Sequence, residues 1–392
     1  MTLSVNIQTY GAVADAQTDN SAIFQQAIDD IISVGGGVLY IPAGIYALHS
    51  QITATCSQQQ HLTIKGDGRY VSVLRFMQGQ QLGISMISTS QQANYLPNFE
   101  VHDLGLVTTQ PNAGTALNFS YAIDQNIENT VNVHDVRITQ DLYSQPLGYW
   151  TQGISCTNAR NGRIRNMHFY GERDAEPQTQ YAIHLQKQCT SFVISDCLIL
   201  ESHTGILAEG STEGVYIHNT DVVGVRKGII HQADQGAEPQ LTITDSHVNA
   251  SETCIHSKNI QQGVIANCLL YANSWFDGPN YPSWQGIKYE GGFNAYNKVL
   301  GCTFSKEDQR HDDQTVGIEI VEGNSMIVDA NQFFAQGNNP LTWGVLVQPA
   351  AYNIKIGASN CYTNVANPSS MQSQPPSQPR AKKPWWRRLL GG

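Results

Sequence analysis

The sequence predicts an all-β chain that winds into a parallel β-helix, a β-solenoid of about ten coils with a short N-terminal capping helix. Two interleaved motifs support this prediction: one contains an Asp or Asn, the other begins with Gly-Ile, and both recur from residue 99 onward. Each pair of motifs takes about 22 to 34 residues, a period typical of solenoid coils. The composition agrees, because 34 glycines and only 14% charged residues suit a turn-rich β structure better than a helical bundle.

Residues 1–50 are expected to form the N-terminal cap and the first coil. Apolar residues recur at helical spacing between Ser21 and Ile32, and Asn20 or Ser21 can begin this helix. Three glycines at 35–37 can end it. A parallel β-helix has open ends with unpaired backbone groups, so an amphipathic helix laid across the first coil would cover one of them.

Residues 51–366 are expected to form the body of the β-helix. Its first motif reads apolar-x-(Asp/Asn)-x-x-apolar, with the Asx residues Asp103, Asp135, Asn166, Asp196, Asn219, Asp245 and Asn267. Asp and Asn tolerate a left-handed backbone and bond neighbouring backbone groups. One Asx residue per coil therefore predicts a tight turn whose copies stack into a ladder.

The Gly-Ile motif predicts the strands of one further sheet. Because strand side chains alternate, the first and third residues after the Ile lie on the outer face. The first outward column is Ser155, His184, Leu207, Ile230, His256, Lys288, Glu319 and Leu346. The second is Thr157, Gln186, Glu209, Gln232, Lys258, Glu290, Val321 and Gln348. His, Lys and Glu side chains are thus expected to gather on one outer face.

Residues 367–392 form a Pro/Gln/Ser linker followed by a basic tail that contains two tryptophans. The tail at 380–392 has five Lys or Arg and no acid; since the whole chain has a formal net charge of -10, the rest carries -15. That balance excludes a general nucleic-acid binder and argues mildly against a strongly anionic polymer as ligand. The tail predicts docking to an acidic partner protein, with contact to an anionic membrane surface or a loose disordered end as alternatives.

The eight cysteines are scattered and form no CxxC pair, which favours buried free thiols over disulfides or metal ligands. The N-terminus lacks a charged segment followed by a long apolar run, so no secretory signal is predicted. No apolar stretch reaches membrane-spanning length, so no integral membrane segment is predicted either. Synthesis in the cytoplasm follows as an expectation.

A longer motif covers the first coil: Tyr10-Gly11-Ala12, then Asp-Asn-Ser-Ala-Ile at 19–23, then Gly-Gly-Val-Leu-Tyr-Ile-Pro-Ala-Gly-x-Tyr at 36–46. It resembles the N-terminal signature of the pectate-lyase-3 family, whose members include phage tailspikes and capsule depolymerases. The resemblance implies a right-handed parallel β-helix, a carbohydrate ligand and a homotrimer. It also implies a protein that is virion-associated or released outside the cell.

The resemblance does not select one reaction. Asn219-Thr220-Asp221 matches the first polygalacturonase motif by letter, but Asn219 is already explained as a ladder residue. The later motifs of that family do not follow at suitable places, and Asp312-Asp313 lies far downstream. The catalytic residues of that family are therefore not carried over.

Four tryptophans precede Gly-Ile strands and are expected to bind a sugar chain: Trp150, Trp275, Trp284 and Trp343. Aromatic rings stack on apolar sugar faces while nearby polar groups bond the hydroxyls. The alternative is that these rings close their loops onto the body of the protein.

Hydrolysis of a glycosidic bond usually takes two carboxyl groups, about 5 Å or about 6.5 to 9.5 Å apart. Our preferred pair is Glu290 with Asp277 or Glu319, and Glu209 is the next candidate. The alternative is that each is an ordinary exposed acid.

A lyase would use other side chains on the same face. Elimination from a uronic acid needs a base and a group that neutralises the carboxylate. His256 and His184, with Lys258 and Lys288, are the candidates for these roles.

A second set of histidines, His102, His134 and His218, belongs to the Asx motif. They are expected to be surface or hydrogen-bonded residues on another face. Their spacing matches no metal motif such as HExxH, so the sequence predicts neither a metal nor a cofactor.

Two functions remain open at this point. One is a polysaccharide depolymerase, a hydrolase or lyase of phage or prophage origin that cuts a bacterial surface glycan. The other is a non-catalytic β-helix that binds glycan or serves as a structural appendage. The missing catalytic motif favours the second function. The loop at 271–284, which contains Trp275 and Trp284 beside the paired acids, favours the first.

Overall fold

The computed structural model describes most of the chain. The described residues are 3–57, 60–77, 83–90, 97–122, 129–141, 148–172, 179–234, 236, 238–274, 283–307 and 314–370. The basic tail at 380–392 lies outside them, as do Trp275 and Asp277.

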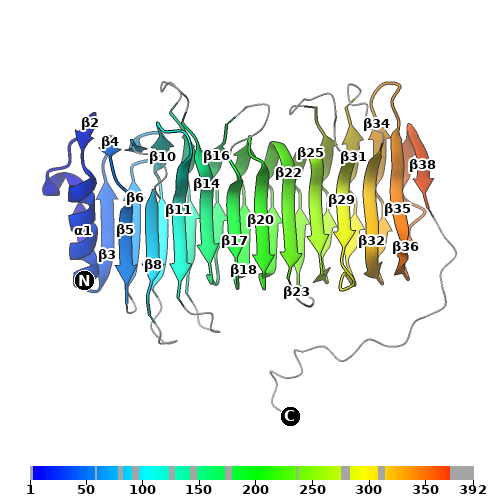
Figure 1. Cartoon of the computed structure of the whole chain (residues 1–392), viewed down its shortest axis with the longest axis horizontal. Coiled ribbons are helices and arrows are strands. Elements are labelled where there is room, and N and C mark those ends of the chain that lie inside the picture. Colours follow the sequence, from blue (N-terminus) through cyan, green and yellow to red (C-terminus); the bar gives the residue numbers. More distant parts are fainter. Residues whose placement is uncertain are drawn as a thin grey trace, which may run out of the picture.

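The chain forms a right-handed parallel β-helix whose coils stack from the N-terminal to the C-terminal end (Figure 1). Each coil places strands on three faces. We call the first the ladder face, and its strands are β1 (Leu3–Asn6), β3 (Gly36–Ile41), β6 (His61–Gly66), β9 (Asn98–His102), β12 (Val131–His134), β15 (Arg163–Arg165), β18 (Thr190–Ser195), β21 (Glu213–His218), β24 (Leu241–Thr244), β27 (Val264–Ala266), β30 (Lys298–Leu300), β33 (Ile327–Asp329) and β36 (Lys355–Ile356).

The other two faces follow the ladder face in each coil. The second face contains β2 (Asp15–Asp19), β4 (Gly44–Leu48), β7 (Ser72–Phe76), β10 (Gly105–Thr108), β13 (Arg137–Gln140), β16 (His168–Tyr170), β19 (Leu198–Leu200), β28 (Leu269–Ala272), β31 (Thr303–Lys306), β34 (Gln332–Ala335) and β37 (Cys361–Thr363). The Gly-Ile face contains β5 (Ile52–Cys56), β8 (Ile84–Ser88), β11 (Ala113–Tyr121), β14 (Trp150–Thr157), β17 (Tyr181–Gln186), β20 (Thr204–Gly210), β29 (Trp284–Glu290), β32 (Thr315–Asn324), β35 (Leu341–Tyr352) and β38 (Val365–Ser369). Two long strands, β22 (Asp221–Ala233) and β25 (His247–Lys258), run through both faces, while β23 (Glu238–Pro239) pairs separately with β26 (Ile260–Gln261).

All these pairings are parallel, so the predicted fold class is confirmed. The ladder face has thirteen strands among the described residues, more than the about ten coils expected from the repeat. The repeat is recognisable in the sequence only from residue 99 onward. Strands β1, β3 and β6 precede that point and belong to the same sheet.

The core of the β-helix consists of side chains stacked one per coil. On the Gly-Ile face the inward residue is an isoleucine in successive strands, from Ile154 through Ile183 and Ile206 to Ile318, and each of these is fully buried. Near the C-terminal end the rings of Phe304, Phe333 and Tyr362 stack with centroids 4.6 and 5.1 Å apart. This in-register stacking fixes which side chains face outward.

The turns between the ladder face and the second face contain the Asx residues of the repeat. All seven have a positive φ, between 46° for Asn219 and 56° for Asp103 and Asp196. Side chains also bond from coil to coil: Asn219 Nδ2 donates to Asp196 Oδ1 at 2.7 Å, and Asn267 Nδ2 to Asp245 Oδ1 at 3.3 Å. The predicted ladder of left-handed Asx turns is therefore confirmed.

Helix α1 (Ser21–Ser33) lies across the N-terminal end of the solenoid (Figure 1). Its buried face, including Phe24, Ile28 and Ile31, joins the core of the first coils. Asn20 occupies the N-cap position, but its side chain bonds Val13 and other backbone groups instead of the helix. A short 3-10 helix, η1 (Ile7–Tyr10), precedes it. The capping helix thus lies where the apolar pattern predicted it.

Seven of the eight cysteines are buried and unpaired, as expected, but Cys361 in the last coil is exposed. The last strand, β38, ends at Ser369, three residues beyond the predicted limit of the β-helix at 366. No helix in the described part of the chain has the length and apolar character needed to span a bilayer.

Candidate functional site

The outward columns predicted for the Gly-Ile face are present in the structure. Strand pairing places Ser155 beside His184, then Leu207, Ile230, His256, Lys288, Glu319 and Leu346, one per coil. In the second column Glu209 pairs with Gln232, Gln232 with Lys258, and Lys258 with Glu290. The charged side chains predicted from the sequence thus lie on one outer strip.

Two His–Glu dyads occupy this strip, and both follow one rule. The histidine is the first residue after the inward Ile, and the glutamate is the third residue after the Ile of the next coil. The first dyad is His184 with Glu209, and the second is His256 with Glu290. Three coils separate them, and Leu207 and Ile230 lie between the two histidines in the same column.

In the first dyad the histidine and glutamate are bonded directly. His184 Nε2 lies 2.7 Å from Glu209 Oε1, and Gln232 Nε2 donates to Glu209 Oε2 at 3.1 Å. The His184 ring packs on Tyr181 with centroids 4.6 Å apart. The sequence analysis missed Tyr181, because it precedes the Gly-Ile position and falls outside the two columns.

In the second dyad a lysine comes between the partners. Lys288 Nζ lies 2.6 Å from Glu290 Oε2, while His256 Nε2 lies 3.4 Å from the same oxygen without hydrogen-bond geometry. Leu207 occupies the corresponding position in the first dyad, where the direct bond forms. Lys288 therefore draws the carboxylate away from the imidazole.

Burial and charge set the protonation of the second dyad. Desolvation, with a smaller contribution from the cations Lys288, Lys258 and Lys227, lowers the pKa of His256 to about 4 against the opposing effect of Glu290. The hydrogen bond from Lys288 holds the pKa of Glu290 below its ordinary value. At neutral pH His256 is a neutral base and Glu290 is an anion.

This protonation conflicts with the role of Glu290 as a proton donor in hydrolysis, which needs a carboxyl with a raised pKa. Glu319 stands opposite Lys288, diagonal to Glu290 as expected, and accepts from Gln348 Nε2 at 3.3 Å. The expected partner Asp277 lies outside the described residues. The structure thus places Glu209, Glu290 and Glu319 on one strip, and the lowered pKa of Glu290 suits a base or nucleophile better than an acid.

Two of the four tryptophans predicted to bind a sugar chain are buried in the structure. Trp150 is 2% exposed and Trp284 is 0% exposed, so both pack in the core and the predicted stacking on sugar is wrong for them. Trp150 also donates from Nε1 to the Thr139 carbonyl at 3.2 Å. Each begins its Gly-Ile strand, where the residue turns inward. Trp343 is partly exposed in β35, and Trp275 lies outside the described residues.

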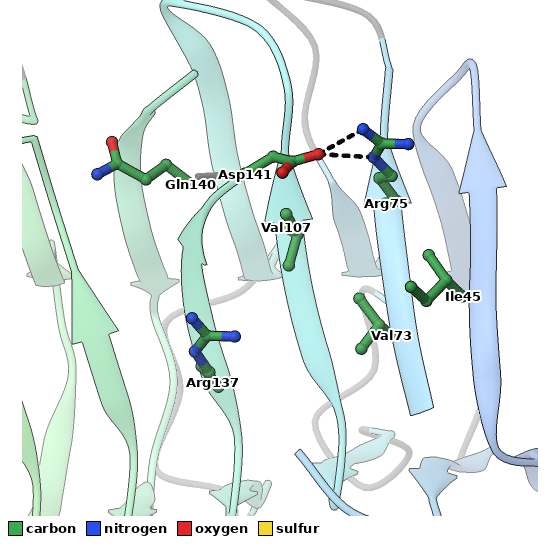
Figure 2. A pocket seen from close by; sticks show the side chains of 7 residues that line it. All are labelled: Ile45, Val73, Arg75, Val107, Arg137, Gln140 and Asp141. Atoms are coloured by element: carbon green, nitrogen blue, oxygen red, sulfur yellow. Dashed lines mark hydrogen bonds and ion pairs between the residues drawn. The ribbon is translucent and has the colours of Figure 1, made fainter. Parts of the chain in front are cut away.

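A separate cavity of about 390 Å³ lies on the second face, across strands β4 to β13 (Figure 2). Arg75 and Asp141 lie at the edge of this cavity. Arg75 donates to Asp141 Oδ2 from Nε at 2.8 Å and from Nη2 at 2.5 Å. Arg137, also in its lining, has its guanidinium 5.2 Å from the Tyr70 ring. Sequence patterns did not reveal this cavity, because its lining comes from four different coils.

Comparisons with known proteins agree with this architecture. Mannuronan C5-epimerase AlgE5 of Azotobacter vinelandii is 28% identical over 107 residues, which cover 26% of this chain and 11% of that protein. A probable rhamnogalacturonase A of Aspergillus oryzae is 28% identical over 177 residues, covering 43% of this chain and 33% of that protein. The chain therefore matches only a minor part of these relatives.

Among solved structures, the DFA-IIIase from Arthrobacter chlorophenolicus A6 superposes with a TM-score of 0.67 at 14% identity, covering 95% of this chain and 100% of that one. At this identity the likeness concerns the fold. The family model described as rhamnogalacturonase A/epimerase, pectate lyase-like matches residues 4–255, more than half of the chain. The chain belongs to the rhamnogalacturonase A/epimerase, pectate lyase-like family.

Proposed function

We propose that the protein is a polysaccharide-modifying enzyme with its active site on the Gly-Ile face around His256. We further propose that it acts on a uronate-containing glycan by removing the proton next to the uronate carboxylate. The observation that carries this proposal is a neutral histidine set among lysines on a strip that crosses several coils. Relatives named as epimerases and as an alginate lyase fit a substrate of this class.

The base in this reaction is His256. A general base must be unprotonated at the working pH, and burial keeps the His256 pKa near 4. Its Nε2 is covered by Glu290 at 3.4 Å. Access to a substrate proton therefore requires the Glu290 carboxylate to move.

The cations supply the second requirement. Removal of the C5 proton places negative charge on the uronate carboxylate, which a nearby ammonium group stabilises. Lys288 already holds a carboxylate, that of Glu290, at 2.6 Å. A substrate carboxylate that replaced Glu290 on Lys288 would uncover His256 in the same step. We assign Glu290 the role of a placeholder for the substrate.

Elimination then balances within the bound sugar. His256 takes the C5 proton, the electron pair forms the C4–C5 double bond, and the bond from C4 to the leaving oxygen breaks. That oxygen takes a proton from water or from the imidazolium. Delivery of a proton from water to the opposite face of C5 would instead give epimerisation, with His256 still taking the first proton and Lys288 still holding the carboxylate.

The net negative charge of the protein does not prevent binding of an acidic glycan. Screening reduces interactions between exposed charges beyond about 8 Å at physiological salt. Lys227, Lys258 and Lys288 all lie close enough to His256 to affect its pKa. A uronate carboxylate bound at His256 would therefore lie close to these cations.

Glycan binding without catalysis is the second candidate. It is favoured by the direct His184–Glu209 bond, the Gln232 contact and the adjacent Tyr181 ring, which form a polar surface with an aromatic side chain. Such a surface can bind sugar hydroxyls without breaking a bond.

The test is to incubate the purified protein with mannuronan, pectic and capsular polysaccharides. Reducing ends and absorbance near 235 nm are followed together, and C5 configuration is followed by NMR. Elimination gives both signals, and epimerisation changes the NMR spectrum alone. Reducing ends without absorbance would mean hydrolysis and would overturn the proposed reaction. Binding without any product would favour the second candidate.

Glu290→Gln distinguishes the two enzymatic mechanisms. A hydrolase that used Glu290 as acid or nucleophile would lose activity by several orders of magnitude. If Glu290 is a placeholder, the variant keeps a measurable rate and binds the acidic glycan more tightly. A bacterial surface glycan as target, phage origin, trimeric assembly and tail docking remain predictions from the sequence.

A further inference from the structure

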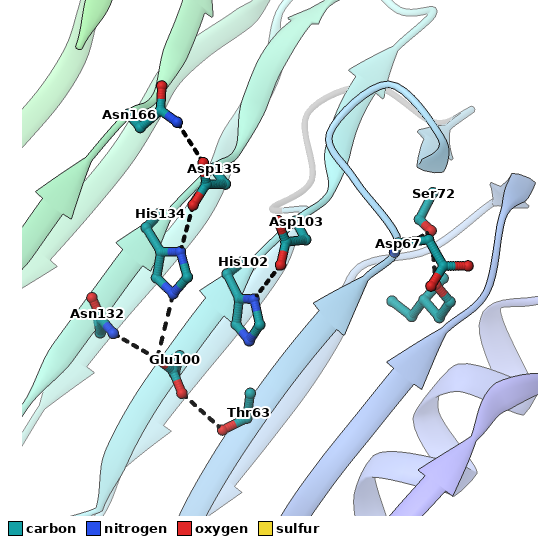
Figure 3. Close-up of polar contacts among 11 residues, drawn as sticks. Thr63, Asp67, Ser72, Glu100, His102, Asp103, Asn132, His134, Asp135 and Asn166 are labelled. Carbon is teal, nitrogen blue, oxygen red and sulfur yellow. Dashed lines mark hydrogen bonds and ion pairs between the residues drawn. The ribbon is translucent and has the colours of Figure 1, made fainter. Parts of the chain in front are cut away.

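We propose that Glu100, His102 and His134 form a binding site for a divalent metal ion of the zinc class. The three residues lie on the ladder face, apart from the Gly-Ile strip (Figure 3). One ligand atom from each lies within 4.8 Å of the others. The sequence alone predicted no metal, because these ligands come from two successive coils instead of one short motif.

The register of two neighbouring strands brings the ligands together. Glu100 and His102 are two residues apart in β9 and therefore point to the same side of the sheet. His134 in β12 pairs directly with His102. Their rings stack with centroids 4.5 Å apart and an interplanar angle of 12°, so corresponding ring atoms lie side by side.

Each histidine is oriented by the aspartate that follows it. His102 Nδ1 lies 2.8 Å from Asp103 Oδ2, and His134 Nδ1 lies 2.8 Å from Asp135 Oδ2. The carboxylate accepts a hydrogen bond from Nδ1–H in each pair, which leaves Nε2 as the ring nitrogen available to a metal. Carboxylates commonly orient metal-binding histidines in this manner. The aspartates of the left-handed turns thus orient both imidazoles so that Nε2 can bind a metal.

Hydrogen bonds hold the Glu100 carboxylate beside these nitrogens. Asn132 Nδ2 donates to Glu100 Oε1 at 2.5 Å, and Thr63 Oγ1 donates to Oε2 at 3.2 Å. His134 Nε2 lies 3.6 Å from Glu100 Oε1. Two ligands bound at about 2.0–2.1 Å in a tetrahedral site are about 3.4 Å apart, so small side-chain rotations suffice to bind an ion.

Ligand type selects the class of ion. Two imidazoles and one carboxylate suit zinc and similar transition ions, whereas calcium and magnesium prefer oxygen ligands. The side chains of His102, His134 and Glu100 are 17%, 16% and 27% exposed, so water can occupy the remaining position. Three protein ligands with an open position are typical of reactive rather than closed structural zinc sites.

The flanking charges limit the affinity. Lys65 pairs with His102 on one side and Arg165 pairs with His134 on the other, and Arg69 lies close enough to Asp135 to attract its carboxylate. These three cations oppose the carboxylates of Glu100, Asp103 and Asp135. Lys65 is directed toward the Tyr40 ring, 5.8 Å from its centroid. We therefore expect a dissociation constant near 1 μM rather than the nanomolar values of charge-rich sites.

The test is calorimetric titration of the chelator-treated full chain with zinc chloride. We expect one ion per chain, and at least a 100-fold loss of affinity in His102→Gln and in His134→Gln. The matched control is His218→Gln, since His218 occupies the same column of the ladder face three coils beyond His134. Its affinity should equal that of the parent. Circular dichroism of each metal-free variant establishes that it folds.

Cobalt gives a second measurement that does not depend on zinc affinity. A bound cobalt ion with nitrogen ligands should give visible absorption bands, which are lost in His134→Gln. Asp135→Asn keeps a residue that tolerates the left-handed turn, and we expect it to weaken zinc binding by about 10- to 100-fold.

Two results would overturn the site. One is the absence of stoichiometric zinc binding by the parent chain. The other is unchanged zinc affinity in His102→Gln, His134→Gln and Glu100→Gln, which would place the ion elsewhere. If the histidine variants fail to fold, the isosteric Glu100→Gln variant decides the matter, with a loss of at least tenfold expected.

Discussion

The two His–Glu dyads of the Gly-Ile face are built by the same rule but differ in one neighbouring residue. His184 bonds Glu209 at 2.7 Å where Leu207 is the adjacent side chain. His256 is separated from Glu290 by 3.4 Å where Lys288 is adjacent and binds that carboxylate. A single position in the next coil thus decides whether the imidazole is tied to a carboxylate or left as a neutral base.

The largest expected effect tests which dyad is catalytic. We expect His256→Gln to lower the rate on a cleavable or epimerisable glycan by about 10²- to 10⁴-fold, because it removes the general base. We expect His184→Gln to lower it by less than about tenfold. Initial rates at saturating glycan measure both. Equal losses in the two variants would assign the chemistry to both dyads and remove the distinction.

Trp284 and Trp343, near the starts of β29 and β35, test which tryptophans stabilise the core and which can bind sugar. Trp284 is fully buried, so Trp284→Ala should lower the free energy of unfolding by about 3–5 kcal/mol. Trp343 is partly exposed, and its alanine variant should lose less stability and more glycan affinity. Chemical denaturation and glycan titration separate the two effects. A stable Trp284→Ala protein with weakened binding would restore the sugar-stacking role for Trp284.

Lys288 holds the position in the second dyad that Leu207 holds in the first. Replacing Lys288 by leucine should therefore make the second dyad resemble the first. In Lys288→Leu the carboxylate of Glu290 is free to bond His256, which should raise the His256 pKa above about 4 although the imidazole stays buried. Because a base must be neutral, the acidic limit of activity should move up in pH by the same amount. NMR titration of the imidazole protons and a pH–rate profile measure the change. A His256 pKa that stays near 4 would assign it to burial alone.

The smallest expected effect concerns the turns that keep the coils in register. Asn219 has φ of 46° and donates to Asp196 Oδ1 at 2.7 Å. Asn219→Ala should lower the free energy of unfolding by about 1–3 kcal/mol, from the left-handed backbone and the lost hydrogen bond. Asn219→Gly, which keeps the left-handed turn and loses only the hydrogen bond, should cost less. Equal losses would mean that the turn conformation contributes little.

Much of the fold follows from the sequence because the β-helix repeats its signals. The Asx residues predicted the left-handed turns, and the inward Ile fixed the alternation that placed His256, Lys288 and Glu290 on one strip. Errors arose where a residue leaves the repeat. Trp150 and Trp284 begin their strands and turn inward, which a position before a Gly-Ile motif does not reveal.

The chemistry of the site was less predictable than its location. The pKa of His256 depends on burial by neighbouring coils, and the state of Glu290 depends on the exact distance to Lys288. Neither quantity is encoded in one segment of sequence. The same limit applied to Glu100, His102 and His134, whose proximity depends on the pairing of β9 with β12.

The spacing of the dyads has a consequence for how such a protein can diversify. Three coils separate His184 from His256, a distance of about 14 Å at the usual strand spacing. Gain or loss of one whole coil leaves every remaining strand with a parallel neighbour, yet changes this distance by about 4.8 Å. The distance between two functional groups along a bound polymer can therefore change only in steps of one coil. Such a step alters neither group itself.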